Sequence, residues 1–207
     1  MKYPNLNFER KALADGCQLI CGLDEAGRGS WAGPVVAAAV IFNPEIKRIQ
    51  GITDSKLLSA KRRETLYEWI TTHCEYGVGI ISEQIIDQIN IYQATRQAMI
   101  EAIMKLKAKP DHLLLDAIRL PALNVKQTPL IKGDQKSWSI AAASIIAKVT
   151  RDRLMREYDT QFPDYGFANH KGYGTPEHRR SLKILGCSPI HRRSYTPVRL
   201  RLEASLV

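Results

Sequence analysis

The most constraining feature of this chain is the stretch 140–149, IAAASIIAKV, which is small and apolar on nearly every side of a helix. A helix that is apolar all round has to be buried. The helical pattern runs from Ser139 to about Tyr158, and its second half becomes basic. The segment therefore predicts a long helix whose first half is packed against a sheet.

Strand patterns come first in the chain and then alternate with helical patterns. Two of them are joined by a glycine-rich turn, which predicts a hairpin. The expected strands are 18–23, 35–42, 76–81, 112–115 and, after a loop with Pro121 and Pro129, 130–131. The expected shorter helices are 59–73, 82–107 with a restart at Asn90, and 175–186 as the last. This order predicts an α/β protein, with helices packed on a mixed sheet.

The length and the charge of the chain narrow the class of protein further. The 207 residues fit one domain, with or without an appended helical part. The formal net charge is +9, and residues 148–201 alone contribute +7 of it. Clustered positive charge favours a nucleic-acid partner, although many small basic proteins have none.

The cysteines and the apolar runs of the sequence indicate the compartment in which we expect the protein. The four cysteines form no CxxC pair and have no histidine at zinc spacing, so we expect small buried side chains. The N-terminus has no apolar signal core, and no run reaches the roughly 18 apolar residues that a membrane span needs. We expect a cytoplasmic protein without a membrane partner, and a monomer by default.

Four acidic residues stand at the ends of apolar elements: Asp24, Glu25, Asp116 and Asp134. Carboxylates are costly there unless they are paired, solvated or bound to metal. Each could instead be a helix cap or a turn former. Neighbouring strand residues point to opposite faces, but the glycines after Glu25 allow a bend that brings both acids to one site. An all-oxygen cluster suits Mg²⁺ or Mn²⁺, and beside a basic face it predicts two-metal phosphodiester hydrolysis.

Five segments carry a resemblance to a known family. They are CGLDEAGRGSWAGPVV (21–36), TDSKLLS (53–59), HLLLDA (112–117), KGDQKSWSIAAASIIAKVTRD (132–152) and HKGYGTPEH (170–178). Together and in this order they resemble the bacterial type 2 ribonucleases H, the ribonuclease HII family. The resemblance implies a single RNase H-like domain, in which helices flank a mixed five-stranded sheet. It also implies a C-terminal helical extension, from about 160 to 207, that contributes to substrate binding.

The resemblance also implies an activity. Members cleave the RNA strand of RNA–DNA hybrids and cut 5′ of single ribonucleotides in duplex DNA, leaving 3′-hydroxyl and 5′-phosphate ends. Two divalent ions, Mg²⁺ or Mn²⁺, take part in catalysis. The family's catalytic metal ligands fall on Asp24, Glu25, Asp116 and Asp134.

Substrate recognition is implied in the same way. Gly27, Arg28 and Gly29 match the family's loop that contacts the ribose 2′-hydroxyl. Tyr173 matches the tyrosine that packs on the neighbouring deoxyribose, and Lys56 is expected to contact a phosphate. A site that hydrogen-bonds a hydroxyl discriminates strongly against its absence, which would explain selectivity for ribose.

Some details depart from the family pattern or stay open. Alanine at 117 follows Asp116 where members often have glycine, and we expect a modest backbone adjustment without loss of the ligand. Type 3 enzymes carry an additional N-terminal domain, and only about sixteen residues precede the first strand here, which favours type 2. Arg192 and Arg193 are expected to meet phosphates, or else to form a solvated basic tail.

Two other functions compete with this interpretation. A nuclease or integrase on the same fold that acts on DNA junctions would not depend on the 2′-hydroxyl. A binding module without catalysis would gain nothing from four acids near phosphate. Cleavage of an all-DNA duplex would favour the first, and tight binding without cleavage the second.

Overall fold

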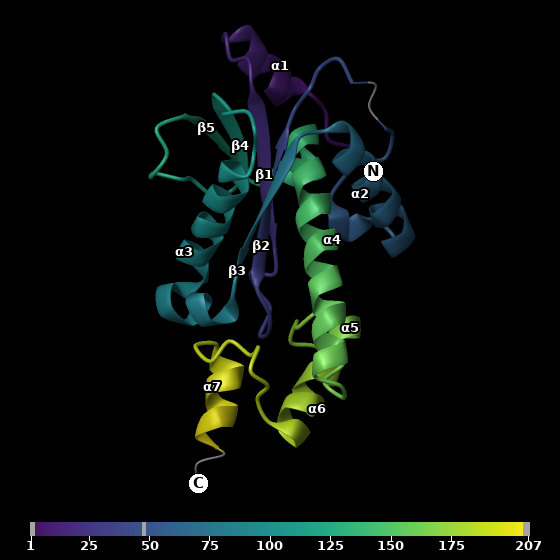
Figure 1. The fold of residues 1–207 in the computed structure, drawn as a ribbon, viewed down its shortest axis with the longest axis vertical. Coiled ribbons are helices and arrows are strands. Elements are labelled where there is room, and N and C mark those ends of the chain that lie inside the picture. Colours follow the sequence, from purple (N-terminus) through teal and green to yellow (C-terminus); the bar gives the residue numbers. More distant parts are fainter. Residues whose placement is uncertain (1–2, 47–48, 205–207) are drawn as a thin grey trace.

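Five strands form one mixed sheet in the computed structural model, which describes residues 3–46 and 49–204 (Figure 1). The strands are β1 (Ile20–Ala26), β2 (Val35–Ile41), β3 (Tyr76–Ile81), β4 (His112–Asp116) and β5 (Lys126–Leu130). Their spatial order is β3-β2-β1-β4-β5. Strand β2 runs antiparallel to both of its neighbours, β1 and β3, while β4 and β5 run parallel to β1. The predicted hairpin and the predicted mixed five-stranded sheet are both confirmed.

Helices cover both faces of this sheet (Figure 1). The helices are α1 (Asn7–Ala14), α2 (Ala60–His73), α3 (Glu83–Met104), α4 (Trp138–Gln161), α5 (Phe167–His170), α6 (Pro176–Leu185) and α7 (Thr196–Glu203). Two short 3-10 helices are η1 (Ser55–Leu57) and η2 (Gly133–Gln135). Figure 1 shows α3 on one face, α4 on the other, and α6 and α7 beyond one end of the sheet.

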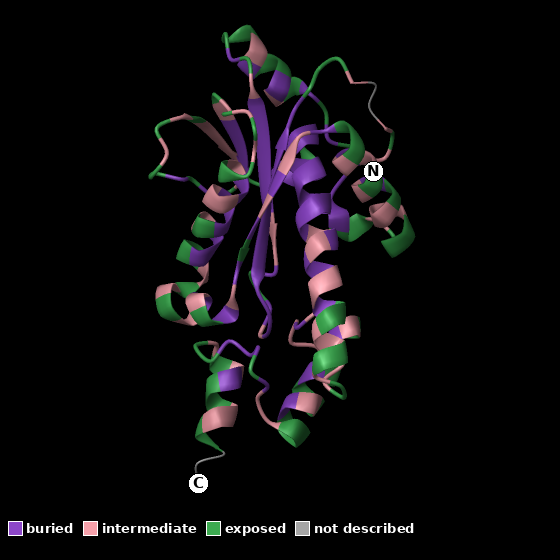
Figure 2. Cartoon of the chain, viewed as in Figure 1, coloured by how far each residue is buried: buried purple, intermediate pink, exposed green. Residues whose placement is uncertain are grey.

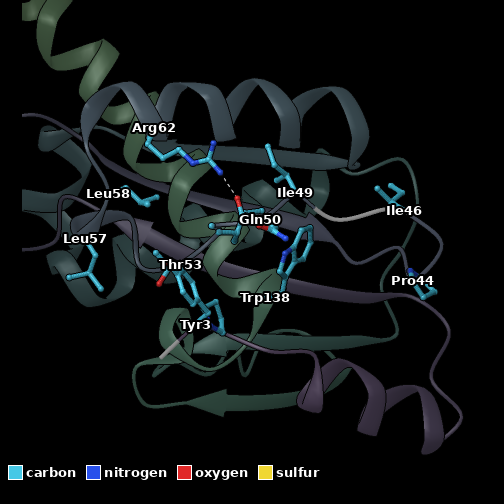
Figure 3. Close-up of a pocket in the computed structure, with 13 residues that line it drawn as sticks. Tyr3, Pro44, Ile46, Ile49, Gln50, Thr53, Leu57, Leu58, Arg62 and Trp138 are labelled. Carbon is cyan, nitrogen blue, oxygen red and sulfur yellow. Dashed lines mark hydrogen bonds between the residues drawn. The ribbon is translucent and has the colours of Figure 1, made fainter. Parts of the chain in front are cut away.

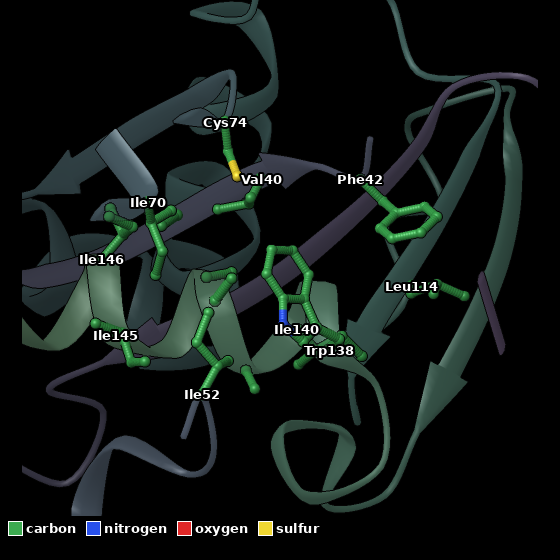
Figure 4. Close-up of a cluster of buried hydrophobic side chains, with 14 of the residues drawn as sticks. Val40, Phe42, Ile52, Ile70, Cys74, Leu114, Trp138, Ile140, Ile145 and Ile146 are labelled. Atoms are coloured by element: carbon green, nitrogen blue, oxygen red, sulfur yellow. The ribbon is translucent and has the colours of Figure 1, made fainter. Parts of the chain in front are cut away.

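Helix α4 packs as its sequence predicts. Residues 138–147 are all buried, and exposed side chains accumulate toward the end of the helix (Figure 2). Its isoleucines meet Val40 of β2 and Leu114 of β4 in a core that Trp138 and Phe42 close on one side (Figure 4). The start of α4 is therefore fixed against the two strands on either side of the central strand β1.

A buried acid from the N-terminal helix also holds the start of α4. The Glu9 carboxylate accepts a hydrogen bond from the Ser139 N–H at 2.9 Å and from the Ser137 hydroxyl at 2.6 Å. A carboxylate at a helix N-terminus is favourable because it meets unpaired N–H groups and the positive end of the helix dipole. This arrangement positions the turn that precedes α4.

The opposite face of the sheet belongs to α3. Ser82 caps this helix, and Asn90 interrupts it with φ 66°, which confirms the predicted restart. The Asn90 side chain accepts hydrogen bonds from the N–H groups of Tyr92 and Gln93, so it caps the second part.

The sequence-based boundaries are wrong in three places. Strand β1 continues through both acids to Ala26, because its pairing with β2 continues. Strand β5 starts at Lys126 and includes Pro129; it lies at the sheet edge, where a missing N–H is tolerated. Helices α1, α5 and α7 were not predicted, and α7 follows the helix that was expected to be last. None of the helices in the described ranges is long and apolar enough to cross a bilayer.

Candidate active site

Strand pairing brings Asp24 and Asp116 next to each other. The parallel register of β1 and β4 pairs Leu23 with Leu115, so the two acids follow side by side. Leu114, two residues before Asp116, packs on the α4 side of the sheet, which places both acids on that face. Asp134 lies in η2, just before α4 begins. Three of the four predicted acids thus come from three elements to one face of the sheet.

These acids affect one another electrostatically. Asp24 is buried, and its Oδ1 accepts a hydrogen bond from the Glu25 N–H at 2.7 Å. Burial, then the charges of Glu25 and Asp116, raise the pKa of Asp24 well above its ordinary value. Burial, then Asp54 and Asp116, raise the pKa of Asp134 to about 6. Without a cation the ionised cluster is therefore unfavourable.

Glu25 does not share a sheet face with Asp24, although a backbone bend was expected to turn both acids to one side. Its partner in the ladder, Ala37, belongs to the core on the α3 side, so Glu25 and Asp24 leave β1 on opposite faces. The Oε1 of Glu25 pairs with Arg28 Nη1 at 3.1 Å. Its Oε2 is buried and has no hydrogen-bond partner among the described residues. Burial raises the pKa of Glu25, and the Arg28 charge opposes that shift only in part.

The donor chemistry of this cluster fits a hard divalent cation. All four acids offer carboxylate oxygens, the ligands that Mg²⁺ and Mn²⁺ prefer. The Glu25 Oε2 atom has no hydrogen-bond partner among the described residues, so it is available as a metal ligand. Within 3–46 and 49–204, no three histidine, cysteine or acidic side chains already enclose one ion position.

The predicted recognition residues share a pocket of about 460 Å³ beside the acids. It is lined by Glu25, Gly27, Arg28, Gly29, Lys56 and Tyr173, together with Ala26, Ser55, Ser144 and Lys148. Ser144 and Lys148 were not predicted as site residues. Their spacing of four residues in a predicted helix places them on one face and could have identified them as a pair.

Lys56 lies in the electric field of the acids. Burial lowers its pKa, but the charges of Asp54, Asp24 and Asp134 outweigh this effect, and the pKa is raised overall. Lys56 follows Asp54, whose Oδ1 accepts a hydrogen bond from the Lys56 N–H at 2.9 Å. The ammonium group is thus a permanent positive charge at the edge of the acidic cluster.

A larger cavity lies elsewhere in the described part of the chain. It measures about 970 Å³ and lies between Trp138, Tyr3 and the segment around Ile49 and Gln50 (Figure 3). Its described lining contains no acidic side chain, and Arg62 there donates a hydrogen bond to the Gln50 carbonyl. Volume alone would therefore have pointed away from the acids.

Comparison with known proteins identifies the family. The family model described as ribonuclease HII matches residues 21–198, which is most of the chain. The chain belongs to the ribonuclease HII family. It is 54% identical over 191 residues to a ribonuclease HII of Ruminiclostridium cellulolyticum, covering 92% of this chain and 74% of that protein. It is 52% identical to the ribonuclease HII of Chloroflexus aurantiacus, covering 94% of each.

Solved structures support the same fold. The ribonuclease H2 of Pyrococcus horikoshii has a TM-score of 0.77 at 27% identity, over 90% of this chain and 98% of that one. A ribonuclease HII of Archaeoglobus fulgidus, solved in complex with PCNA, has a TM-score of 0.72 at 31% identity, over 86% and 96%. As a member of this family, the chain is a ribonuclease of the H type, a metal-dependent hydrolase of phosphodiester bonds.

Two buried arginines hold the loop between β1 and β2, residues 27–34, which we call the glycine loop of this ribonuclease HII family member. Arg151 of α4 donates to the carbonyls of Pro34 at 2.9 Å, Ala32 at 3.1 Å and Lys171 at 2.9 Å. Gly27 has φ +96°, and a Cβ there would lie 2.1 Å from Arg151 Nε, so glycine is required. A Cβ at Gly29 would meet nothing within 4 Å, which leaves that side of the loop open.

Arg192 is the second of these arginines, and its expected contact with phosphate is wrong. Its guanidinium is buried and donates to the carbonyls of Gly33 at 2.9 Å and Arg28 at 3.1 Å. The neighbouring Arg193 is exposed, and its main-chain N–H donates to Asp87 at 2.8 Å, while its guanidinium contacts no acid among the described residues. The pair therefore divides into one structural arginine and one that is free to meet a polyanion.

We expect Arg192→Ala to lower the free energy of unfolding by about 3 kcal/mol, because buried carbonyls lose a charged donor. Arg193→Ala, one residue away and exposed, is the matched control and should change it by less than about 0.5 kcal/mol. Urea unfolding followed by circular dichroism measures both. Equal effects of the two substitutions would contradict the structural role.

The alanine after Asp116 adopts a conformation that favours glycine. Ala117 has φ 54°, and its N–H donates to the Leu130 carbonyl at 3.1 Å. Asp116 still accepts a hydrogen bond from the Gly133 N–H, at 2.7 Å. The family departure is thus accommodated by left-handed backbone at one residue.

Ala117→Gly should therefore stabilise the protein by about 0.5–1 kcal/mol, since the strain of a Cβ in the left-handed region exceeds the entropy that glycine loses. Ala122→Gly in the same exposed loop has no positive φ to relieve and should destabilise by a similar amount. Thermal unfolding of both variants gives the sign. Destabilisation by both substitutions would show that Ala117 is not strained.

Proposed function

We propose that this chain cleaves the RNA strand of RNA–DNA hybrids and cuts on the 5′ side of single ribonucleotides embedded in duplex DNA. The products carry 3′-hydroxyl and 5′-phosphate ends. The observation that supports this best is the pocket of about 460 Å³, where the glycine loop, Lys56 and Tyr173 lie beside Glu25. Groups suited to recognise a sugar thus adjoin groups suited to hold metal.

In this proposal Asp24, Glu25, Asp116 and Asp134 are the catalytic acids and bind two Mg²⁺ or Mn²⁺ ions. When bound, such ions activate the attacking water and offset charge on the leaving 3′-oxygen. The acids must be deprotonated to act as ligands. Because the pKa values of Asp24 and Asp134 are raised, metal affinity and activity should both fall as the pH decreases toward 6 and below.

The glycine loop would read the 2′-hydroxyl. The open space beside Gly29 lets a sugar approach the main chain, while Arg151 and Arg192 keep the loop in one conformation. A rigid site that pairs with a hydroxyl leaves its own polar groups unpaired when the hydroxyl is absent. Lys56 would contact a phosphate next to the acids.

Tyr173 would pack on the deoxyribose that follows the ribonucleotide. It is partly exposed in the turn between α5 and α6, and its ring lies 5.5 Å from the Arg151 guanidinium carbon. The region from about 160 to 207 would thus contribute to substrate binding within a single catalytic domain, and one copy of the chain would be sufficient.

The test uses labelled DNA duplexes that differ in one hydroxyl group. One carries a single ribonucleotide, the second is all DNA, and a third substrate is a long RNA–DNA hybrid. Each is incubated with Mg²⁺, with Mn²⁺ or with chelator. A cut 5′ of the ribonucleotide, metal-dependent and absent from the all-DNA duplex, is the expected result.

Each alternative function has its own outcome in this assay. Cutting of the all-DNA duplex would replace the proposal by a nuclease that acts on DNA structure. Binding of all duplexes without cleavage in either metal would replace it by a module that only binds nucleic acid. Cleavage of the hybrid alone would leave the ribonuclease activity and remove the incision at single ribonucleotides.

A further inference from the structure

Three buried histidines lie together behind the turn that carries Tyr173. They are His170 at the end of α5, His178 in α6, and His191 after α6. The rings of His170 and His178 are parallel, with centroids 4.3 Å apart, and Nε2 of His178 lies 3.0 Å from Nε2 of His191. The acid cluster and the substrate pocket contain none of these rings.

The hydrogen bonds of this cluster fix where each proton sits. His191 Nδ1 accepts from the Ser188 N–H at 2.9 Å, so its proton is on Nε2. That Nε2–H must donate to His178 Nε2, which leaves the His178 proton on Nδ1. The Nδ1–H of His178 then donates to the Tyr173 carbonyl at 3.0 Å. The chain of donors therefore runs in one direction, from Ser188 to Tyr173.

The third histidine holds the other side of the same turn. His170 Nδ1 accepts from the Gly172 N–H at 3.1 Å, and its Nε2–H donates to the Tyr165 carbonyl at 2.8 Å. All three rings are then neutral. A second proton on His178 would set two N–H groups against each other at 3.0 Å.

The surroundings of the cluster keep it neutral. Aromatic rings pack around it, with Phe167 5.7 Å and Trp31 5.5 Å from the ring of His178. Glu177 lies next to it in α6 but affects the His178 pKa only weakly. Burial, then the neighbouring histidines, lower the pKa of His178 to about 4 and that of His191 to about 3.

We propose that His178 is a positioning residue for Tyr173, and that His191 sets the tautomer in which His178 can act. Its Nδ1–H fixes the peptide between Tyr173 and Gly174, and thereby the direction from which the tyrosine ring meets a sugar. Trp31, two residues after Gly29, packs against the same histidine with its ring tilted by 39°, and so links both recognition loops. The inference rests on the proposed role of Tyr173.

The protonation of the histidine ring nitrogens can be measured by NMR, which tests the proposal without an activity assay. In ¹⁵N-labelled protein between pH 6 and 8, long-range ¹H–¹⁵N spectra should show His178 as the Nδ1–H tautomer and His170 and His191 as Nε2–H. The His191→Ala variant should still fold, but its His178 should be a mixture of the Nδ1–H and Nε2–H tautomers. A charged His178 in the wild type at these pH values, or the Nε2–H form, would overturn the proposal.

Two replacements of His178 separate positioning from general stability. Asparagine places its amide near the position of Nδ1 and can still donate to Tyr173, whereas glutamine reaches only the position of Nε2. On the single-ribonucleotide duplex, His178→Gln should lower kcat/KM by roughly tenfold or more, since misplacement by about 1 Å can cost up to 10²-fold. His178→Asn should lose less than about threefold. On a long hybrid, where cleavage does not need a DNA junction, both losses should be smaller.

A double-mutant cycle with Tyr173→Ala completes the test. If His178 acts through Tyr173, His178→Gln should have almost no further effect once the tyrosine ring is absent. Equal effects in both backgrounds would overturn the inference. If Tyr173→Ala itself leaves the ratio between the two substrates unchanged, the proposed function of Tyr173 fails instead. Thermal unfolding of each variant identifies any loss that comes from misfolding.

Discussion

Replacing Asp24 by asparagine is expected to slow cleavage of the single-ribonucleotide duplex by on the order of 10³-fold. A metal ligand that is lost at the centre of the cluster removes several kcal/mol of charge stabilisation, and each 1.36 kcal/mol is a factor of ten. Asp24 is the central position because it is buried and interacts with both Glu25 and Asp116. Calorimetric titration with Mn²⁺ should show weaker binding by the same variant.

Stability provides the internal control for this prediction. The pKa of Asp24 is raised in the folded protein, so the folded state binds its proton more tightly than the unfolded chain does. Ionisation above the unfolded pKa therefore costs stability in the metal-free protein, and Asp24→Asn should raise its melting temperature at pH 7. Asp15→Asn, which removes an exposed carboxylate, should change neither rate nor stability. Full activity of Asp24→Asn would exclude Asp24 as a metal ligand.

Gly22→Ala is expected to have the largest effect on folding, a loss of about 3 kcal/mol or more. A Cβ at Gly22 would lie 2.2 Å from the main-chain carbon of Ser139 and 2.5 Å from the nitrogen of Ile140. Backbone atoms of a buried helix cannot move aside as a flexible side chain would, so β1 and α4 must separate. Because Asp24 follows Gly22 and Asp134 precedes α4, the same shift separates two of the acids.

Gly29→Ala is the matched control for this substitution, because a Cβ at Gly29 meets nothing within 4 Å. Urea unfolding should show a stability close to that of the wild type for Gly29→Ala and a large loss for Gly22→Ala. If Gly22→Ala folds with unchanged stability, the close approach of β1 and α4 is not as the structure describes it. If it folds and binds Mn²⁺ normally, the spacing of the acids does not depend on this contact.

Local sequence patterns predicted the elements but not every boundary. Ser59, Ser82 and Thr175 each precede a helix and cap it with the side chain, so the starts of those helices could be read directly. Strand β1 could not be delimited, because its two acids look like the end of an apolar run. Pairing with β2, a long-range property, carries it to Ala26.

The candidate site was predictable in its acids and less so in its framework. Asp116 and Asp134 could be placed because the first ends an apolar strand and the second precedes a buried helix. The role of Arg192 could not, since nothing local distinguishes it from exposed Arg193. Burial of a guanidinium depends on carbonyls that come from residues more than 150 positions earlier. The hydrogen-bonded histidines could not be predicted from the sequence either, because their contacts also join residues that are apart in the chain.

The two buried arginines have a consequence for synthesis of the protein. The last strand of the sheet ends at Leu130, and η2 and α4 follow it, so all four acids are translated before Arg192. The glycine loop, however, receives donors from Arg151 and Arg192, and the latter is translated last. A chain still on the ribosome therefore contains all four acids before Arg192 is available to hold the loop between β1 and β2.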